Sequence, residues 1–191
     1  MNFREYKKLV YSDFYRISDY TGIWTFLKLL FNHEGFTYTF WMRTCNYLKS
    51  KKILKLSFYI IAKGILRHYK YKFGIVIPFT TKIDSGIYIG HFGQIIVNGN
   101  SIIGKNCNIS QGVTLGQVNR GNKIGSPIIG ENVYIGPGVK IIGNIKVGNN
   151  VAIGANCVVT KDIPDNAVVV GIPGKVISYD GSEGYVNRTD Y

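Results

Sequence analysis

The sequence has little of what disulfide-rich, metal-binding or membrane-spanning proteins use. Its 191 residues include three cysteines, two methionines and five prolines. Cys45, Cys107 and Cys157 are isolated and odd in number, so neither a disulfide framework nor a thiolate metal site is expected. No apolar run is long enough to span a bilayer, and Met1 to Asp19 lacks the apolar segment of a signal peptide. We therefore expect a cytoplasmic protein with reduced thiols.

Acidic residues are scarce in the first part of the chain. Residues 1–73 hold 14 Lys and Arg against four Asp and Glu, together with 19 of the 26 aromatic residues. Residues 74–191 are nearly neutral and contain most of the 23 glycines. Charge, aromatic content and glycine content all change at the same place, which marks a boundary. We predict a helical N-terminal region at 1–73, a repeat domain at 74–177 and a polar C-terminal tail at 178–191.

The N-terminal region follows a helical period. Trp24 and Leu27 belong to a series of apolar residues at helical spacing, and Gly35 is predicted to end that helix. Two further helices are predicted, at about 38–48 and 53–69.

A six-residue repeat fills the second region. Thirteen aliphatic residues align at steps of six, apart from one step of eight and one of fourteen: Ile77, Ile83, Ile89, Ile95, Ile103, Ile109, Leu115, Ile129, Ile135, Ile141, Val147, Ile153 and Val159. Glycine follows seven of these thirteen residues. A short fixed period of this kind is the signature of a solenoid, in which each unit packs only on its neighbours.

Each unit of the repeat is expected to be a short strand followed by a corner. Residues two apart on a strand share a face, so the aliphatic residues point inward, and glycine or asparagine accommodates the turn. Three sides close one coil, and stacked coils bury a column of Ile and Val. No segment from Ile77 to Val159 is long enough for a helix, which excludes a βαβ fold. We predict a mainly β protein, a parallel β-helix of about four coils with an N-terminal α-helical segment, and place Cys107 and Cys157 in its core.

Residues 77–177 resemble the left-handed β-helix, hexapeptide-repeat acyltransferases, and more closely their serine acetyltransferase-like branch. The matching stretches are GIYIGHFGQIIV, NISQGVTLGQ, YIGPGVKIIGNIKVGNNVAIGANCVVTKDIP and VVVGIPGKVI. The helical residues 12–70 resemble the N-terminal region of that branch more weakly. The resemblance implies a left-handed coil, a homotrimer and acetyl-CoA lying in a groove between adjacent β-helices.

Among the three histidines, His91 is the candidate catalytic residue. It stands two residues after the inward-pointing Ile89, at a coil corner, so its ring cannot lie in the aliphatic column. Gly90 and Gly93 let a ligand or another chain approach closely. The sequence YIGHFG resembles the catalytic-histidine corner of the family. A neutral imidazole can remove the proton of a hydroxyl while that hydroxyl attacks a thioester.

The other two histidines, His33 and His68, are expected to be capping or surface residues. Asp84 is the nearest acid to His91 in sequence and is a candidate for orienting its ring.

The resemblance also assigns coenzyme A to small corner residues and two lysines. These are Gly136, Pro137, Gly154, Ala155, Lys161, Gly171, Pro173 and Lys175. Small side chains leave space for an arm that runs along the backbone, and a lysine suits a phosphate as a point charge. No His, Cys and carboxylate set has metal-ligand spacing, and no glycine-rich dinucleotide loop precedes a helix. We expect acetyl-CoA as co-substrate and no metal.

The chain departs from the serine acetyltransferases at positions that serve the amino acid substrate. Residues 116–128 form a long loop, and the Arg-His pair of the family falls there on Gly125 and Ser126. Two acids of the family fall on Gly90 and Val76. We therefore expect the acceptor to be a carbohydrate hydroxyl, on a surface polysaccharide, its lipid-linked precursor or a nucleotide sugar. Serine O-acetylation is the alternative.

Two hypotheses from other functional classes stay open: a non-catalytic β-helix scaffold and a basic nucleic-acid-binding module. The basic, aromatic residues 36–73 carry no RNP, zinc-finger or helix-turn-helix signature, so no nucleic-acid partner is expected. The excess charge of residues 1–73 suggests instead a peripheral contact with the anionic inner face of a membrane. The aromatic residues named for that contact are Phe36, Phe40, Trp41, Phe58 and Tyr59.

Overall fold

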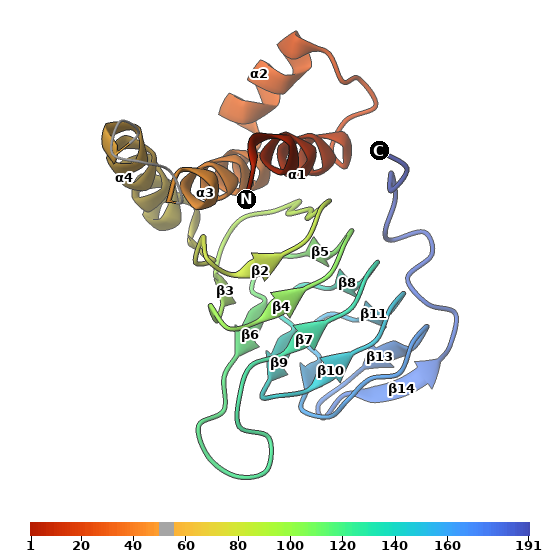
Figure 1. The fold of residues 1–191 in the computed structure, drawn as a ribbon. Helices are drawn as coiled ribbons and strands as arrows, with labels where there is room; N and C mark the ends of the chain where they lie inside the picture. Colours follow the sequence, from red (N-terminus) through yellow and green to blue (C-terminus); the bar gives the residue numbers. More distant parts are fainter. Residues whose placement is uncertain (50–55) are drawn as a thin grey trace.

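Helices lie over one end of a stack of short strands (Figure 1). The computed structural model describes residues 1–49 and 56–191. In these residues the helices are α1 (Phe3–Tyr15), α2 (Ile23–Asn32), α3 (Glu34–Lys49) and α4 (Leu56–Phe73). The chain passes from α4 into the strands at Gly74, whose φ of 62° favours glycine.

The strands form three sheets, one on each side of a triangular coil. Sheet order is β1-β3-β6-β9-β12 on the first face, β2-β4-β7-β10 on the second and β5-β8-β11-β13-β14 on the third. The first face consists of β1 (Ile75–Val76), β3 (Ile95–Val97), β6 (Thr114–Gly116), β9 (Lys140–Ile142) and β12 (Val158–Val159). The second consists of β2 (Lys82–Ile83), β4 (Ile102–Ile103), β7 (Ile128–Ile129) and β10 (Lys146–Val147). The third consists of β5 (Asn108–Ile109), β8 (Tyr134–Ile135), β11 (Ala152–Ile153), β13 (Val168–Val170) and β14 (Lys175–Ser178).

The pairing register reproduces the repeat. Ile103 pairs with Ile83 and with Ile129, and Ile135 pairs with Ile109, so equivalent aliphatic residues stack from coil to coil. All of these pairings are parallel, and among the described strands only β14 turns back to pair antiparallel with β13. The predicted fold, a left-handed parallel β-helix with an N-terminal helical segment, is confirmed. The first face has five strands because the repeat both begins on it, at β1, and ends on it, at β12, so that four coils separate its first and last strands.

The core is the inward column of the β-helix. Cys107 and Cys157 are fully buried in it, as their register predicts. One corner is held by an asparagine ladder in which each side-chain amide donates to the side-chain oxygen of the asparagine in the next coil. The ladder consists of Asn106, Asn132, Asn150 and Asn166, each with positive φ.

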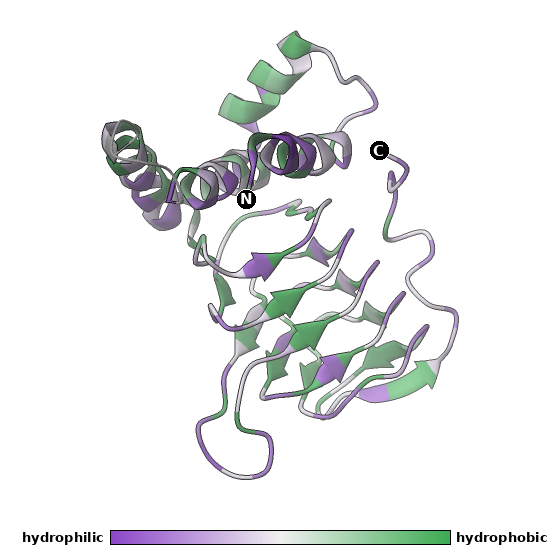
Figure 2. Cartoon of the chain, viewed as in Figure 1, coloured by the Kyte–Doolittle hydropathy of each residue, from purple (hydrophilic) through white to green (hydrophobic). Residues whose placement is uncertain are grey.

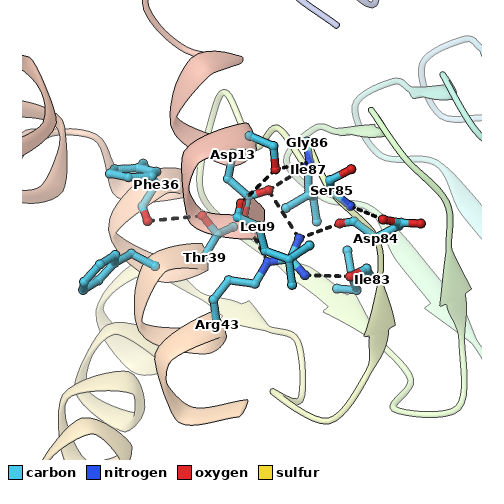
Figure 3. A network of polar contacts seen from close by, with 12 residues as sticks. Leu9, Asp13, Phe36, Thr39, Arg43, Ile83, Asp84, Ser85, Gly86 and Ile87 are labelled. Atoms are coloured by element: carbon cyan, nitrogen blue, oxygen red, sulfur yellow. Dashed lines mark hydrogen bonds and ion pairs between the residues drawn. The ribbon is translucent and has the colours of Figure 1, made fainter. Parts of the chain in front are cut away.

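A buried ion pair joins the helices to the first coil (Figure 3). On α3, Arg43 donates to the carboxylate of Asp13 on α1, with 3.0 Å between Nε and Oδ2. It also donates to the backbone carbonyls of Ile83 and Asp84, at 2.6 Å each. Asp13 in turn accepts the N–H of Ile87. Burial raises the pKa of Asp13, and the charge and hydrogen bonds of Arg43 oppose that rise.

The helical region differs from expectation in three places. The helix α1 was not predicted, because its apolar residues are interrupted by lysines and tyrosines. Gly35 does not end a helix but lies in the first turn of α3, where it is buried. The third predicted helix ends at Phe73 rather than 69, and its predicted start at 53–55 lies outside the described residues.

The aromatic residues named for a membrane contact are largely part of the helical core. Phe36 is buried against Phe14, and Phe40 and Trp41 are half-buried, while Phe58 is exposed. Exposed apolar side chains of this region lie on α2, which Figure 2 shows as largely hydrophobic, and on α4, at Phe58, Ile60 and Ile61. Within the described residues, no helix combines the length and apolar character that a membrane crossing requires.

Candidate functional site

His91 lies at the corner where the chain passes from the third face to the first. Before it, Tyr88 bridges to Asn108 on the third face, and after it the chain enters β3 on the first. Ile89 is buried in the column, whereas His91 is exposed. The predicted placement of the ring outside the core therefore holds in the structure.

The same corner recurs in every coil and forms one long edge of the prism, here called the His91 edge. It comprises residues 90–94, 110–113, 136–139, 154–157 and 171–174. Backbone hydrogen bonds join successive corners, from Gly112 N–H to the Gly93 oxygen and from Gly138 N–H to the Gln111 oxygen. Because coils repeat at about 4.8 Å, the corner in the fourth coil lies about 14 Å along this edge from His91.

Most residues assigned to coenzyme A lie on the His91 edge. They are Gly136, Pro137, Gly154, Ala155, Gly171 and Pro173. A Cβ on Gly136 would meet the Ile153 oxygen at 2.7 Å, so that glycine is required by coil stacking itself. Ala155, Gly171 and Pro173 are exposed and accessible to a ligand.

The two lysines assigned to coenzyme A are placed differently from one another. Lys175 begins β14 beside Val170, close to the end of the His91 edge. Lys161 follows β12 at the corner between the first and second faces. The width of the first face therefore separates Lys161 from the small residues within one chain.

One polar atom on the His91 edge lacks a partner. Gln111 lies one coil away from His91, and its side-chain oxygen is buried with no hydrogen bond among the described residues. A buried amide oxygen of this kind costs free energy unless it accepts a hydrogen bond. Because this oxygen is buried, a ligand can reach it only if the side chain turns outward.

Asp84, the candidate partner of His91, lies at a different corner. It follows β2 on the second face, and its carboxylate accepts the N–H of Ser85. A cavity of about 660 Å³ beneath α1 and α3 is lined by Asp84 and Lys82, away from the His91 edge. The structure does not bring Asp84 and His91 together.

The start of α3 approaches His91 instead. A Cβ on Gly35 would overlap the carbonyl oxygen of Ile89, so only glycine allows this helix to lie so close to the corner. His33, two residues before Gly35, is half-buried, with its ring centroid 6.4 Å from that of Tyr88. The sequence could not show this approach, because nothing in it relates Gly35 to Ile89. The close backbone packing explains the glycine that was taken as a helix stop.

His33 caps α3, as its expected role required. Its Nδ1 accepts the backbone N–H of Phe36 at 3.2 Å. Burial lowers the pKa of His33 and the nearby His91 lowers it further, while the His33 backbone carbonyl and Glu34 raise it. The exposed His68 lies on α4, away from this corner.

The loop 116–128 stands at another corner, between the first and second faces, and projects from the body of the molecule (Figure 1). Ser126 is buried there and donates to the side-chain oxygen of Asn98 at 3.0 Å. Gly125 pairs with Val118 across the loop. Within one chain, the positions of the expected Arg-His pair are therefore not on the His91 edge.

Comparison with known proteins gives the same fold and a common name. The family model described as "Bacterial transferase hexapeptide (six repeats)" matches residues 126–161. A serine acetyltransferase of Staphylococcus aureus (strain Mu50) is 38% identical over 136 residues, which are 71% of this chain and 64% of the relative. One of Synechococcus elongatus is 41% identical over 108 residues, which are 56% of this chain and 44% of the relative. The chain thus spans less than two thirds of the length of these curated relatives.

Solved structures cover more of the chain. A serine acetyltransferase in complex with cysteine is 30% identical with a TM-score of 0.69, covering 88% of this chain and 68% of that one. The enzyme of Brucella abortus in complex with coenzyme A is 26% identical with a TM-score of 0.71, covering 92% and 67%. The expected carbohydrate acceptor is wrong on this finding, since these relatives and structures are serine acetyltransferases. The absence of the Arg-His pair at Gly125 and Ser126 did not indicate a different branch.

Proposed function

Because the chain belongs to the serine acetyltransferase branch of the hexapeptide-repeat acyltransferases, we propose that it transfers an acetyl group from acetyl-CoA to the hydroxyl of L-serine. The observation that carries this proposal is the exposed His91 at the head of an edge of small residues. The name shared by the relatives supports serine as acceptor.

His91 acts as the general base in this proposal. Its imidazole takes the proton of the serine hydroxyl while the hydroxyl oxygen attacks the thioester carbon. The carbon–sulfur bond then breaks, the acetyl group stays on the serine oxygen, and the imidazolium returns the proton to the sulfur of coenzyme A. A positioned base of this kind contributes about 10²–10⁴-fold to the rate, and holding both substrates together contributes much of the rest.

Acetyl-CoA would lie along the His91 edge with its thioester next to His91. The exposed Ala155, Gly171 and Pro173 leave the backbone open to its arm. Lys175 lies near the far end of the edge, where a phosphate of the nucleotide part can pair with it. In this arrangement, Lys161 would come from a neighbouring copy of the chain.

The same geometry supports the proposal of a homotrimer. Lys161 and the loop 116–128 lie at a corner different from that of His91, so a neighbouring copy is needed to bring them to the edge. The outward side chains of Ile96 and Ile102, 48% and 38% exposed on the first and second faces, are apolar surface that such a contact would cover. Light scattering should report three chains per particle, and a monomer that is active would contradict this part.

We also propose a peripheral membrane contact through residues 1–73. Ile23, Trp24, Leu27 and Phe31 fall within an arc of about 100° on α2. They are 65%, 82%, 37% and 75% exposed, a stripe without a partner in the described residues. Together with the excess of basic residues in 1–73, this stripe suits the interface of an anionic bilayer.

The proposed function is tested by following acetyl transfer from acetyl-CoA with mass spectrometry of the products. O-acetylserine should form with L-serine as acceptor and should be absent without enzyme. Release of coenzyme A with no acetylated serine would contradict the acceptor. No release with any hydroxyl acceptor would favour the scaffold alternative.

A further inference from the structure

The start of α3 and the catalytic corner are fixed to each other. The contact between Gly35 and the Ile89 carbonyl admits no Cβ, so this spacing is set by backbone against backbone. His33 precedes Gly35 by two residues, and His91 follows Ile89 by two residues. Tyr88 lies between these segments, with its ring 6.4 Å from His33 and its hydroxyl 3.0 Å from the Cβ position of Gly90. Two histidines from distant parts of the sequence are therefore held at one corner.

The cap of α3 determines which nitrogen of His33 carries the proton. Since Nδ1 accepts the N–H of Phe36, the hydrogen of the neutral ring must be on Nε2. Burial and the neighbouring His91 lower the pKa of His33, which keeps the ring neutral near pH 7. His33 is then a fixed N–H donor beside an exposed base.

The acceptor of the proposed reaction carries a carboxylate, which requires a donor close to His91. Ser126 already donates to Asn98, and Gly125 has no side chain to offer. At the corner itself, Glu34 has the wrong charge for a carboxylate. At this corner His33, the hydroxyl of Tyr88 and the exposed amide of Gln94 can donate, and His33 is the one whose donor nitrogen is fixed by a helix cap.

We propose that the Nε2–H of His33 donates a hydrogen bond to the carboxylate of the acceptor and so directs its hydroxyl to His91. His33 is then a residue that determines specificity for carboxylate-bearing acceptors. The inference rests on the proposed function and adds the residue that selects the substrate. The ionisable groups facing His33 are Glu34, Tyr88 and His91.

The experiment compares L-serine with L-serinamide, which lacks the carboxylate, in wild type and in H33S. Serine is a good cap, so H33S keeps the hydrogen bond to Phe36 but has no donor that reaches the acceptor. A hydrogen bond to a charged group corresponds to roughly 10–100-fold in kcat/KM. We expect H33S to lose that factor with L-serine, mainly through KM, and to leave L-serinamide nearly unchanged. H33Q, whose amide can donate at a similar reach, should recover part of the loss.

The control is H68S, which removes an exposed histidine on α4 and should change neither acceptor. An H33S enzyme of wild-type thermal stability that loses both acceptors equally, or loses neither, would overturn the inference while leaving the proposed function standing. Wild type that acetylates no serine would overturn the proposed function first and this inference with it.

Discussion

Replacing Arg43 with methionine should remove much of the stability of the helical cap. The side chain of Arg43 is 4% exposed and that of its partner Asp13 is 1% exposed. Methionine keeps most of the volume but leaves a buried carboxylate without its cation, and two carbonyls, of Ile83 and Asp84, without their donor. Breaking a buried pair in this way costs about 3–5 kcal/mol. The total free energy of unfolding of a typical domain is only about 5–15 kcal/mol.

Urea unfolding followed by circular dichroism measures this loss in the free energy of unfolding. With a slope of about 2 kcal/mol per molar urea, the midpoint of R43M should fall by about 1.5–2.5 M. Two variants sharpen the comparison. R188M breaks the pair of Arg188 with Asp19, whose side chains are 35% and 73% exposed, and should cost less than about 1 kcal/mol. The double variant D13N/R43M should be more stable than R43M, because the buried charge is gone while Ile87 keeps an acceptor.

A change of less than about 1 kcal/mol in R43M would contradict the role of Arg43 in compensating the buried charge of Asp13, since a buried, uncompensated carboxylate cannot cost so little. A double variant no more stable than R43M would show that lost packing, and not the unpaired charge of Asp13, accounts for the effect.

Three further predictions follow. Burial raises the pKa of Cys107 to about 12 and that of Cys45 to about 11, so a thiol reagent at pH 8 should label neither until the protein unfolds; stoichiometric labelling of the native protein would contradict this. Because the folded-state pKa of His33 is lowered, the unfolded state binds more protons, and stability should be full above about pH 6.5 and fall as pH drops below it. The free energy of unfolding should depend less on pH in H33S than in wild type. An equal pH dependence in both proteins would contradict this prediction. Wild type should sediment with anionic but not neutral vesicles, and W24S/F31S should lose this binding. Y179S, at another exposed aromatic residue on the opposite end, should keep it. Wild type that stays in the supernatant at low salt would end the membrane proposal.

The β-helix could be predicted from sequence because its information is local and periodic. Each inward residue, such as Ile135, is set by a six-residue rule and packs on the equivalent residue of the next coil, such as Ile109 and Ile153. The helix α1 follows no such rule. It is held by long-range contacts, such as the hydrogen bond from the N–H of Ile87 to the Asp13 carboxylate, and no sequence period predicts such contacts.

In the candidate site too, features that depend on the repeat could be predicted, and features that depend on long-range contacts could not. His91 was chosen as a candidate because the repeat places it at a corner and because YIGHFG resembles the catalytic-histidine corner of the family, and the same resemblance assigned the small residues of its edge to coenzyme A. The approach of His33 was missed, since it depends on Gly35 packing against Ile89 across more than fifty residues. The acceptor was predicted wrongly because the lack of side chains at Gly125 and Ser126 was taken as evidence about the substrate. The absence of the family's side chains at aligned positions does not show which groups other residues provide to the substrate.

The most direct measurement is the rate of O-acetylserine formation by wild type and H91A, with H68A as control and trimer content checked for each. We predict that wild type and H68A form the product at equal rates, while correctly folded H91A loses about 10²–10⁴-fold. Near-normal turnover by H91A, or no O-acetylserine from wild type, would contradict the assignment of this edge as the active site.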